Sequence, residues 1–114
     1  MQISGDLRPF SKDDIDHAPE EAGVYALYRG DSLIYIGRAE GGLSMTTIRA
    51  RLKNHQAGSF GPMTKTATHY RCEVRPDPVA RERELLREYE ELHGQLPRCN
   101  HASYLPRSGP RRIY

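Results

Sequence analysis

Two short apolar segments separated by a polar turn are the clearest pattern along this chain. Residues 24–28 and 33–36 are rich in β-branched and aromatic side chains, and residues 29–32 between them have the composition of a turn. The pattern predicts a β-hairpin.

The register of this hairpin decides where its two tyrosines lie. Side chains alternate between the faces of a strand, so a two-residue loop would place Tyr25 and Tyr35 on opposite faces, whereas a three- or five-residue loop would place them on the same face. The longer loop also gathers an aliphatic set on the other face, namely Val24, Ala26, Ile34 and Ile36. Because register follows the hydrophobic pattern, we predict that the two tyrosines lie side by side, with Gly37 just beyond.

A helix is predicted over residues 47–57, with Thr46 or Thr47 as its N-cap. Ile48 and Leu52 form an apolar stripe at positions i and i+4, which is the spacing of one helix face. This stripe is the side on which the helix is expected to pack.

Two polar residues share that packing side. Arg51 and His55 follow Ile48 by three and seven residues, and turning such groups inward costs stability. They are therefore candidate functional residues. Arg49 and Lys53 point away from the stripe, which predicts solvated positions that could contact a nucleic-acid backbone.

A third strand is predicted over residues 68–75, and a long helix over 79–93 that ends at Gly94. The apolar face of this helix consists of five residues, Val79, Leu85, Leu86, Tyr89 and Leu92. Glu82 lies in the middle of that face, so one carboxylate of a Glu-rich helix is expected to point inward. Glu84 is the alternative, but it directly precedes Leu85 and points off the apolar stripe.

The remaining segments are expected to connect these elements. Residues 1–21 form a lead-in with a short helix around 12–17, which Ser11 caps. Residues 39–46 and 58–67 are predicted to be loops, and the basic tail 101–114 is predicted to be extended. The expected fold is therefore α+β: one domain over residues 22–100, with a three-stranded antiparallel sheet flanked by helices.

Composition is consistent with a single soluble domain. The chain has 114 residues and a net charge of +2, and 37% of its residues are hydrophobic. It has no apolar run of the length that spans a bilayer, and Cys72 and Cys99 are too few for a disulfide scaffold. We therefore expect no membrane association and a cytoplasmic location.

The charges are segregated along the chain. Arginine outnumbers lysine 14 to 3, and no acidic residue lies between Glu40 and Glu73. Arginine suits bidentate contact with phosphate, and segregated charge can build a groove of one sign on a protein with little net charge. This pattern favours nucleic acid as a partner.

The polar residues turned inward suggest a class of chemistry. A carboxylate with an arginine suits a hard divalent cation and a phosphate group. The cysteines and histidines that could propose zinc, Cys72, His93, Cys99 and His101, match no familiar ligand spacing, so no zinc is expected. From these residues alone, metal-assisted phosphodiester chemistry is a hypothesis.

Motifs at these positions resemble those of the GIY-YIG nuclease family. The GVY sequence at 23–25 and the YIG sequence at 35–37 resemble the two halves of the family signature. Arg51 and His55 match the R-x-x-x-H/Y helix that follows this signature.

Two further matches extend the resemblance over roughly residues 22–100. Glu82, with its E-x-x-L-L spacing, matches the metal-binding glutamate of the family's later helix, and the P-x-x-N sequence at 97–100 matches the closing motif. The resemblance implies a three-stranded sheet flanked by helices that cuts DNA with one Mg²⁺ or Mn²⁺ ion, held by Glu82.

The resemblance also implies roles for individual residues. Tyr25 and Tyr35 would position or deprotonate the attacking water, and Arg51 would bind the scissile phosphate. Arg38, where relatives often have lysine, would assist Arg51.

His55 would join the proton network, and Asn100 would orient the glutamate or close the site. Other interpretations stay open: a non-catalytic nucleic-acid-binding module with the same fold, and a protein partner that supplies target specificity. The form of the nucleic acid is not determined by these motifs.

Overall fold

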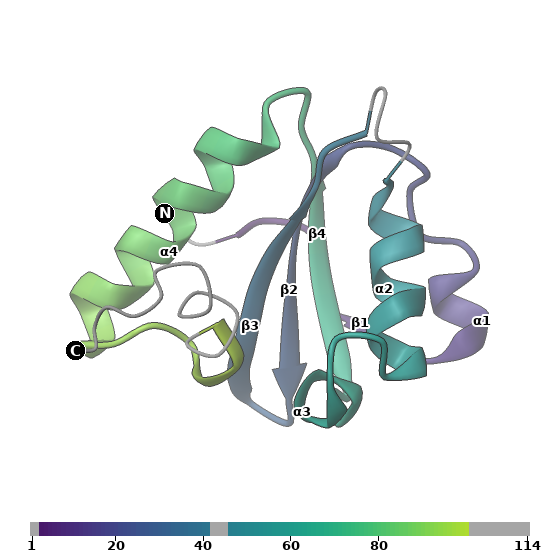
Figure 1. Ribbon diagram of the computed structural model, residues 1–114, viewed down its shortest axis with the longest axis horizontal. Helices are drawn as coiled ribbons and strands as arrows, with labels where there is room; N and C mark the ends of the chain where they lie inside the picture. Colours follow the sequence, from purple (N-terminus) through teal and green to yellow (C-terminus); the bar gives the residue numbers. More distant parts are fainter. Residues whose placement is uncertain (1–2, 42–45, 101–114) are drawn as a thin grey trace.

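An antiparallel sheet forms the centre of the protein in a computed structural model, which describes residues 3–41 and 46–100 (Figure 1). Its strands within these ranges are β1 (Arg8–Pro9), β2 (Gly23–Arg29), β3 (Ser32–Ala39) and β4 (His69–Val74). They lie in the order β1-β4-β2-β3, so β3 forms one edge of the sheet. The α+β prediction is confirmed. The predicted tail 101–114 lies outside the described residues, as do residues 42–45 of the predicted 39–46 loop.

The sheet has four strands rather than the three predicted. The additional strand β1 pairs with β4 through Arg8–Tyr70 and Pro9–His69. A strand of two residues is too short to show an alternating pattern. Proline at a sheet edge is tolerated because no ladder hydrogen bond is needed from it there.

Helices cover both faces of the sheet. The helices are α1 (Lys12–Ile15), α2 (Ile48–Ala57), α3 (Pro62–Lys65) and α4 (Pro78–His93). Figure 1 shows α1 and α2 on one side of the sheet and α4 on the other. No helix in the described ranges is long and apolar enough to cross a membrane.

The ends of these helices follow the predicted caps. The side chain of Ser11 accepts a hydrogen bond from the Asp14 amide, and that of Thr47 accepts one from the Ala50 amide. Gly94 ends α4 in the left-handed conformation, with φ 77°. These local signals therefore placed helix boundaries to within one residue for α2 and α4.

The two tyrosines of the hairpin lie on the same face, as predicted, but the loop between the strands is shorter than predicted. Arg29 pairs with Ser32 across a two-residue turn, but the register shifts after Leu27, so that Ile34 is an extra residue in β3. This β-bulge returns Tyr35 to the face of Tyr25.

The bulge also corrects one expected position. Ile34 packs with the tyrosines, on the α2 side of the sheet, whereas Val24, Ala26 and Ile36 pack against α4 as predicted. The predicted three- or five-residue loop was wrong because a bulge can restore the register that a short loop breaks.

Two further predictions about helices were wrong. Within the predicted loop 58–67, residues 62–65 form α3. On α4, Val79 and Leu92 are 37% and 68% exposed, while Arg81 is buried. The amphipathic pattern marks the side of α4 that packs, but it does not show that an arginine at the edge of this side is buried by an ion pair.

Candidate functional site

Gly37 allows the two tyrosines of the hairpin to pack over the backbone of β3. The Tyr25 and Tyr35 rings lie with their centroids 6.1 Å apart. A Cβ at position 37 would lie 2.6 Å from the Tyr25 hydroxyl oxygen and 2.7 Å from Cε2 of Tyr35. Only glycine leaves this space, so the glycine of the YIG sequence is required by the packing of both tyrosines.

Gly23 has a comparable steric role at the start of β2. A Cβ there would overlap the carbonyl oxygen of Glu73 on β4 and press on the side chain of Ile48 on α2. The glycine therefore lets β2 approach both neighbours, which brings α2 over the tyrosine face of the sheet.

His55 connects the tyrosine face to α3. Its Nε2 atom lies 2.8 Å from the Tyr25 hydroxyl oxygen, and its Nδ1 atom lies 2.8 Å from Oγ1 of Thr64. The side chain is fully buried. Burial, helped by the positive charge of Arg51, lowers the pKa of His55 to about 3. The imidazole is therefore neutral near pH 7, with one nitrogen donating and the other accepting a hydrogen bond.

Tyr25 is also fully buried, and this burial has a chemical consequence. Burial and the neighbouring Tyr35 raise the pKa of the Tyr25 phenol, while Arg51 partly opposes the rise. Glu82 adds a smaller upward contribution. The phenol therefore stays protonated at neutral pH.

Arg51 lies between the tyrosines and an aromatic ring. Its guanidinium carbon is 4.4 Å from the centre of the Phe60 ring. Burial disfavours the charged guanidinium, but Tyr25 and Tyr35 more than compensate and raise the pKa of Arg51. Its Nε atom is buried and, among the described residues, has no hydrogen-bond acceptor. A buried donor without an acceptor is costly, so this position suits an anionic ligand.

Two residues of this cluster were missed by sequence reasoning. Thr64 holds His55, and Phe60 packs against both His55, at 4.6 Å between ring centres, and Arg51. Gly61 followed by Pro62 is a typical helix start, and this signal could have identified α3 and hence Thr64. Nothing local distinguishes Phe60, which is 44% exposed, from an ordinary loop aromatic.

Glu82 lies on the side of α4 that faces β3. Its Oε1 atom is 2.6 Å from Nη1 of Arg38, and Nε of Arg38 is 2.8 Å from Oε2 of Glu40. Arg38 thus contacts the carboxylate that was expected to hold a metal. The alternative, Glu84, is exposed and forms an ion pair with Arg81 at 2.6 Å. Glu82 thus points toward the sheet and Glu84 does not, and the assignment of Glu82 as the metal ligand stays a prediction.

Asn100 is buried against the free edge of β3. Its Oδ1 accepts a hydrogen bond from the Ile36 amide and its Nδ2 donates one to the Ile36 carbonyl, both at 2.7 Å. The side-chain amide therefore satisfies the main chain of the YIG sequence. This contact supports the positions of Tyr35 and Gly37, and the role that the resemblance implies for Asn100, orienting the glutamate or closing the site, stays a prediction.

Arg49 and Lys53 lie on another side of α2. Nη1 of Arg49 is 3.1 Å from Glu20, and Nζ of Lys53 is 3.2 Å from Asp16. Acidic residues of the lead-in thus neutralise both cations. Their contact with nucleic acid stays a prediction, and it would have to compete with these ion pairs.

The donor set fits one hard divalent cation better than a soft metal. The described residues contain no group of three or more His, Cys, Asp or Glu side chains that could hold a metal. Burial raises the pKa of the Cys72 and Cys99 thiols, which disfavours the thiolate that zinc needs. Mg²⁺ commonly takes one or two carboxylates and completes its shell with water and phosphate oxygens, and Glu82 can serve such a site.

Comparisons with known proteins found no match for this chain, whether among family models, curated proteins or solved structures. The functional argument therefore rests on the chain's own residues and on the motifs that they form.

Proposed function

We propose that this protein is a divalent-metal-dependent endonuclease of the GIY-YIG type, which hydrolyses phosphodiester bonds of DNA. The observation that carries the proposal is a cluster of polar side chains on one face of the sheet. Its members come from three elements: Tyr25 from β2, Tyr35 from β3, and Arg51 and His55 from α2. Glu82 lies on α4 and contacts Arg38 of β3 at 2.6 Å. Turning a guanidinium and an imidazole toward the packing side of α2 costs stability, which supports a functional reason for the cluster.

Arg51 would bind the scissile phosphate in this mechanism. Its buried Nε lacks an acceptor among the described residues, and a phosphate oxygen would provide one. Guanidinium groups stabilise the charge that develops as a phosphodiester is attacked. Phe60 stacks on the guanidinium and limits its rotation, so the donor is held in place before substrate binds.

Tyr35 would contact the attacking water, because it is 8% exposed whereas Tyr25 is completely enclosed. Tyr25 would be a positioning residue that keeps the side chains of His55 and Arg51 in place. The neutral His55 orients the Tyr25 hydroxyl through its Nε2 atom, 2.8 Å away, and this contact is how it would join the proton network. When bound by Glu82, Mg²⁺ or Mn²⁺ would supply positive charge next to the phosphate.

A second function is favoured by one contact. Because Arg38 contacts Glu82 at 2.6 Å, the carboxylate is already neutralised by a cation of the protein itself. This arrangement suits a non-catalytic module that binds nucleic acid without a metal. The basic residues would then give salt-sensitive binding without cleavage.

Cleavage assays separate the two functions. The protein is incubated with labelled flap, nicked, branched, single-stranded and duplex DNA, together with a matched RNA, in Mg²⁺, Mn²⁺ or EDTA. The endonuclease proposal predicts products with a metal and none in EDTA. In Tyr35→Phe and Glu82→Gln we expect the rate to fall by at least about 100-fold, the lower range for losing general acid–base catalysis, while binding is retained.

Glu84→Gln is the matched control for the carboxylate. It removes the neighbouring acid on the same helix and should leave the cleavage rate within about twofold, since exposed ion pairs contribute little. Cleavage unaffected by Tyr35→Phe and Glu82→Gln would refute the assignment. Binding without cleavage on every substrate would support the non-catalytic function. The proposal includes a protein partner that supplies target specificity. If cleavage needs this partner, it should occur only when the partner is added.

A further inference from the structure

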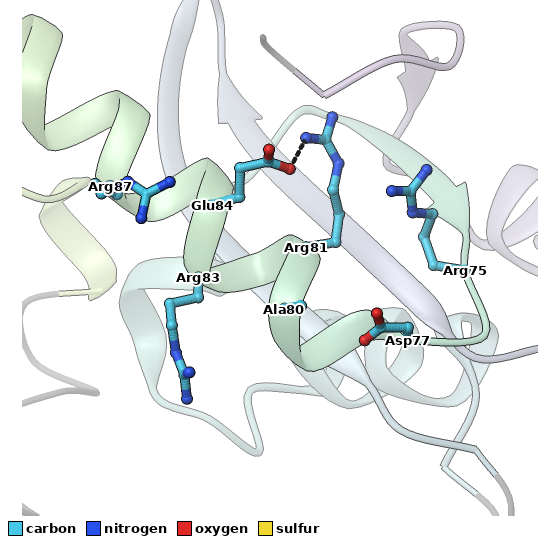
Figure 2. Close-up of a pocket in the computed structure, with 7 residues that line it drawn as sticks. All are labelled: Arg75, Asp77, Ala80, Arg81, Arg83, Glu84 and Arg87. Carbon is cyan, nitrogen blue, oxygen red and sulfur yellow. Dashed lines mark hydrogen bonds and ion pairs between the residues drawn. The ribbon is translucent and has the colours of Figure 1, made fainter.

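A pocket rich in arginine lies where β4 leads into α4, outside the tyrosine cluster. It has a volume of about 310 Å³ and is lined by Arg75, Asp77, Ala80, Arg81, Arg83, Glu84 and Arg87. In Figure 2, Arg75 and Arg87 flank the Arg81–Glu84 ion pair from opposite sides. Four guanidinium groups thus share the lining with two carboxylates, which leaves an excess of positive charge.

Arg81 lines this pocket with a side chain that is held in place by two carboxylates. Its Nε and Nη2 atoms donate to the two carboxylate oxygens of Glu73, at 2.9 and 3.0 Å, and its Nη1 atom donates to Glu84 at 2.6 Å. Hydrogen bonds from Arg81 and Ser4 hold the pKa of Glu73 at about 2. The group therefore stays ionised, and the charge of Arg81 is used within the protein.

The other cations are available. Within the ranges that the structure describes, Arg83 and Arg87 are exposed and form no ion pair, and Arg75 reaches Glu73 only at 4.0 Å. Arg83 and Arg87 are one turn apart on α4, where like charges repel each other. An anion bound between them would relieve this repulsion, and guanidinium groups match phosphate oxygens in geometry.

The pocket lies on a different side of α4 from the candidate metal carboxylate. A helix turns about 100° per residue, so Arg83 and Arg87 lie roughly 100° and 140° round the axis from Glu82. Glu82 contacts Arg38 of β3, whereas the pocket opens on the side of α4 facing away from β3. A phosphate held here could not be the one attacked at Glu82.

We propose that this pocket binds the phosphate backbone of the nucleic acid at a point distant from the scissile phosphate. The inference rests on the proposed function and deepens it. Nucleic acid that reaches both places must extend round the outside of α4, so the pocket contributes to binding only on substrates long or branched enough to do so. Arg83 and Arg87 carry the contact, with Arg75 at its other side.

The test compares Arg83→Gln/Arg87→Gln with the control Arg29→Gln/Lys65→Gln, which removes two exposed cations elsewhere. Binding of labelled short duplex, long duplex and branched DNA is measured by fluorescence anisotropy over a range of salt concentrations. Each lost phosphate contact lowers the slope of log K against log salt by about 0.9. We expect a reduction of 1 to 2 on long or branched DNA for the pocket variant, and little change on the short duplex or in the control.

Further measurements separate this inference from the proposed function. The pocket variant should cleave at an unchanged kcat but a raised KM on long or branched DNA. If the wild-type protein cleaves and the pocket variant behaves like the control, only the pocket inference is refuted. If the wild-type protein binds no nucleic acid, both proposals fail. Titration with inorganic phosphate at matched ionic strength tests a free anion, and tight binding without any effect on DNA would also overturn the inference.

Discussion

His55 is the residue on which the tyrosine cluster depends, because one buried imidazole satisfies hydroxyl groups from two other elements. Tyr25 on β2 and Thr64 on α3 each lie 2.8 Å from one of its nitrogens. The ring is uncharged when it does this, since its pKa is lowered to about 3. A neutral buried imidazole makes the stability of the protein depend on pH in a definite direction.

The first prediction is that acid destabilises the protein through His55. In the unfolded chain the imidazole takes up a proton near pH 6.5, but in the folded protein only near pH 3. The unfolded state therefore binds more protons between these values, and the free energy of unfolding falls as the pH is lowered through this window. One group contributes about 1.4 kcal/mol per pH unit, which urea unfolding followed by circular dichroism can measure.

The variant His55→Gln should flatten this dependence between pH 7 and 5, where Glu73, with a pKa of about 2, remains ionised in the folded protein. It should also cost about 1–3 kcal/mol at pH 7, because Tyr25 or Thr64 loses its partner. His93→Gln, an exposed histidine on α4, should keep the wild-type slope. An equal slope in His55→Gln and wild type would contradict the prediction.

At the scale of the elements, β3 is the strand that joins the two sides of the sheet. One face carries Tyr35 into the cluster with α2, and Arg38 on the other reaches Glu82 of α4. Asn100 holds the outer edge of the strand through the Ile36 main chain. Small displacements of β3 should therefore be felt in the cluster and at the carboxylate together.

The second prediction concerns Gly37, over which both tyrosines pack. Gly37→Ala places a methyl group against the Tyr25 and Tyr35 rings, so overpacking should cost about 1–3 kcal/mol and move the rings. Near-ultraviolet circular dichroism should report the altered environment of the tyrosines. Gly30→Ala in the hairpin turn, with φ 60°, is the control: it should cost about 1–2 kcal/mol and leave this signal unchanged. The reverse order of spectral effects would refute the packing argument.

The third prediction concerns the contact between β3 and α4, and it assumes the proposed metal site. Arg38 neutralises Glu82, so it competes with a divalent cation. Arg38→Ala should strengthen Mn²⁺ binding by up to roughly fivefold, as expected if this partly buried ion pair contributes about 1 kcal/mol. Electron paramagnetic resonance of free Mn²⁺ measures this without substrate.

Glu82→Gln provides the control for that experiment, because it should abolish the binding whether or not Arg38 is present. If Arg38→Ala weakens Mn²⁺ binding instead, Arg38 organises the site rather than competing for it. If Glu82→Gln binds Mn²⁺ as wild type does, Glu82 is not the ligand.

At the scale of the whole molecule, one buried ion pair connects the lead-in, the sheet and α4. Glu73 of β4 accepts hydrogen bonds from the amide and hydroxyl of Ser4 and from Arg81 of α4. Both charged side chains are less than 10% exposed. The position of α4, and hence of Glu82, therefore depends on a charge pair away from the cluster.

The fourth prediction follows from this pair. Arg81→Met leaves Glu73 buried without its cation, which should lower the free energy of unfolding by about 3–5 kcal/mol. The double variant Glu73→Gln/Arg81→Met should recover part of this loss, because no buried charge remains. Glu84→Gln, which removes the exposed partner of Arg81, should cost less than about 1 kcal/mol. Denaturant unfolding of wild type, Glu73→Gln, Arg81→Met and the double variant gives the coupling energy of the pair, and additive losses would contradict the predicted coupling.

The elements with local signals could be predicted from the chain alone. Turn residues and alternating apolar positions predicted the hairpin, Thr47 and Gly94 marked helix ends, and the spacing of Ile48, Leu52 and His55 identified the packing side of α2. Each signal acts between residues a few positions apart, so a single chain is enough to read it. The motifs also selected the residues that meet in the cluster.

Features that depend on contacts between elements could be seen only in the folded protein. These are the bulge at Ile34, the pairing of β1 with β4, the support of His55 by Thr64, and the burial of Arg81 by Glu73. Each depends on a contact between two different elements, so it leaves no periodic pattern within either element. The place of Arg38 on the Glu82 carboxylate is of the same kind, because it depends on how β3 and α4 pack across the edge of the sheet.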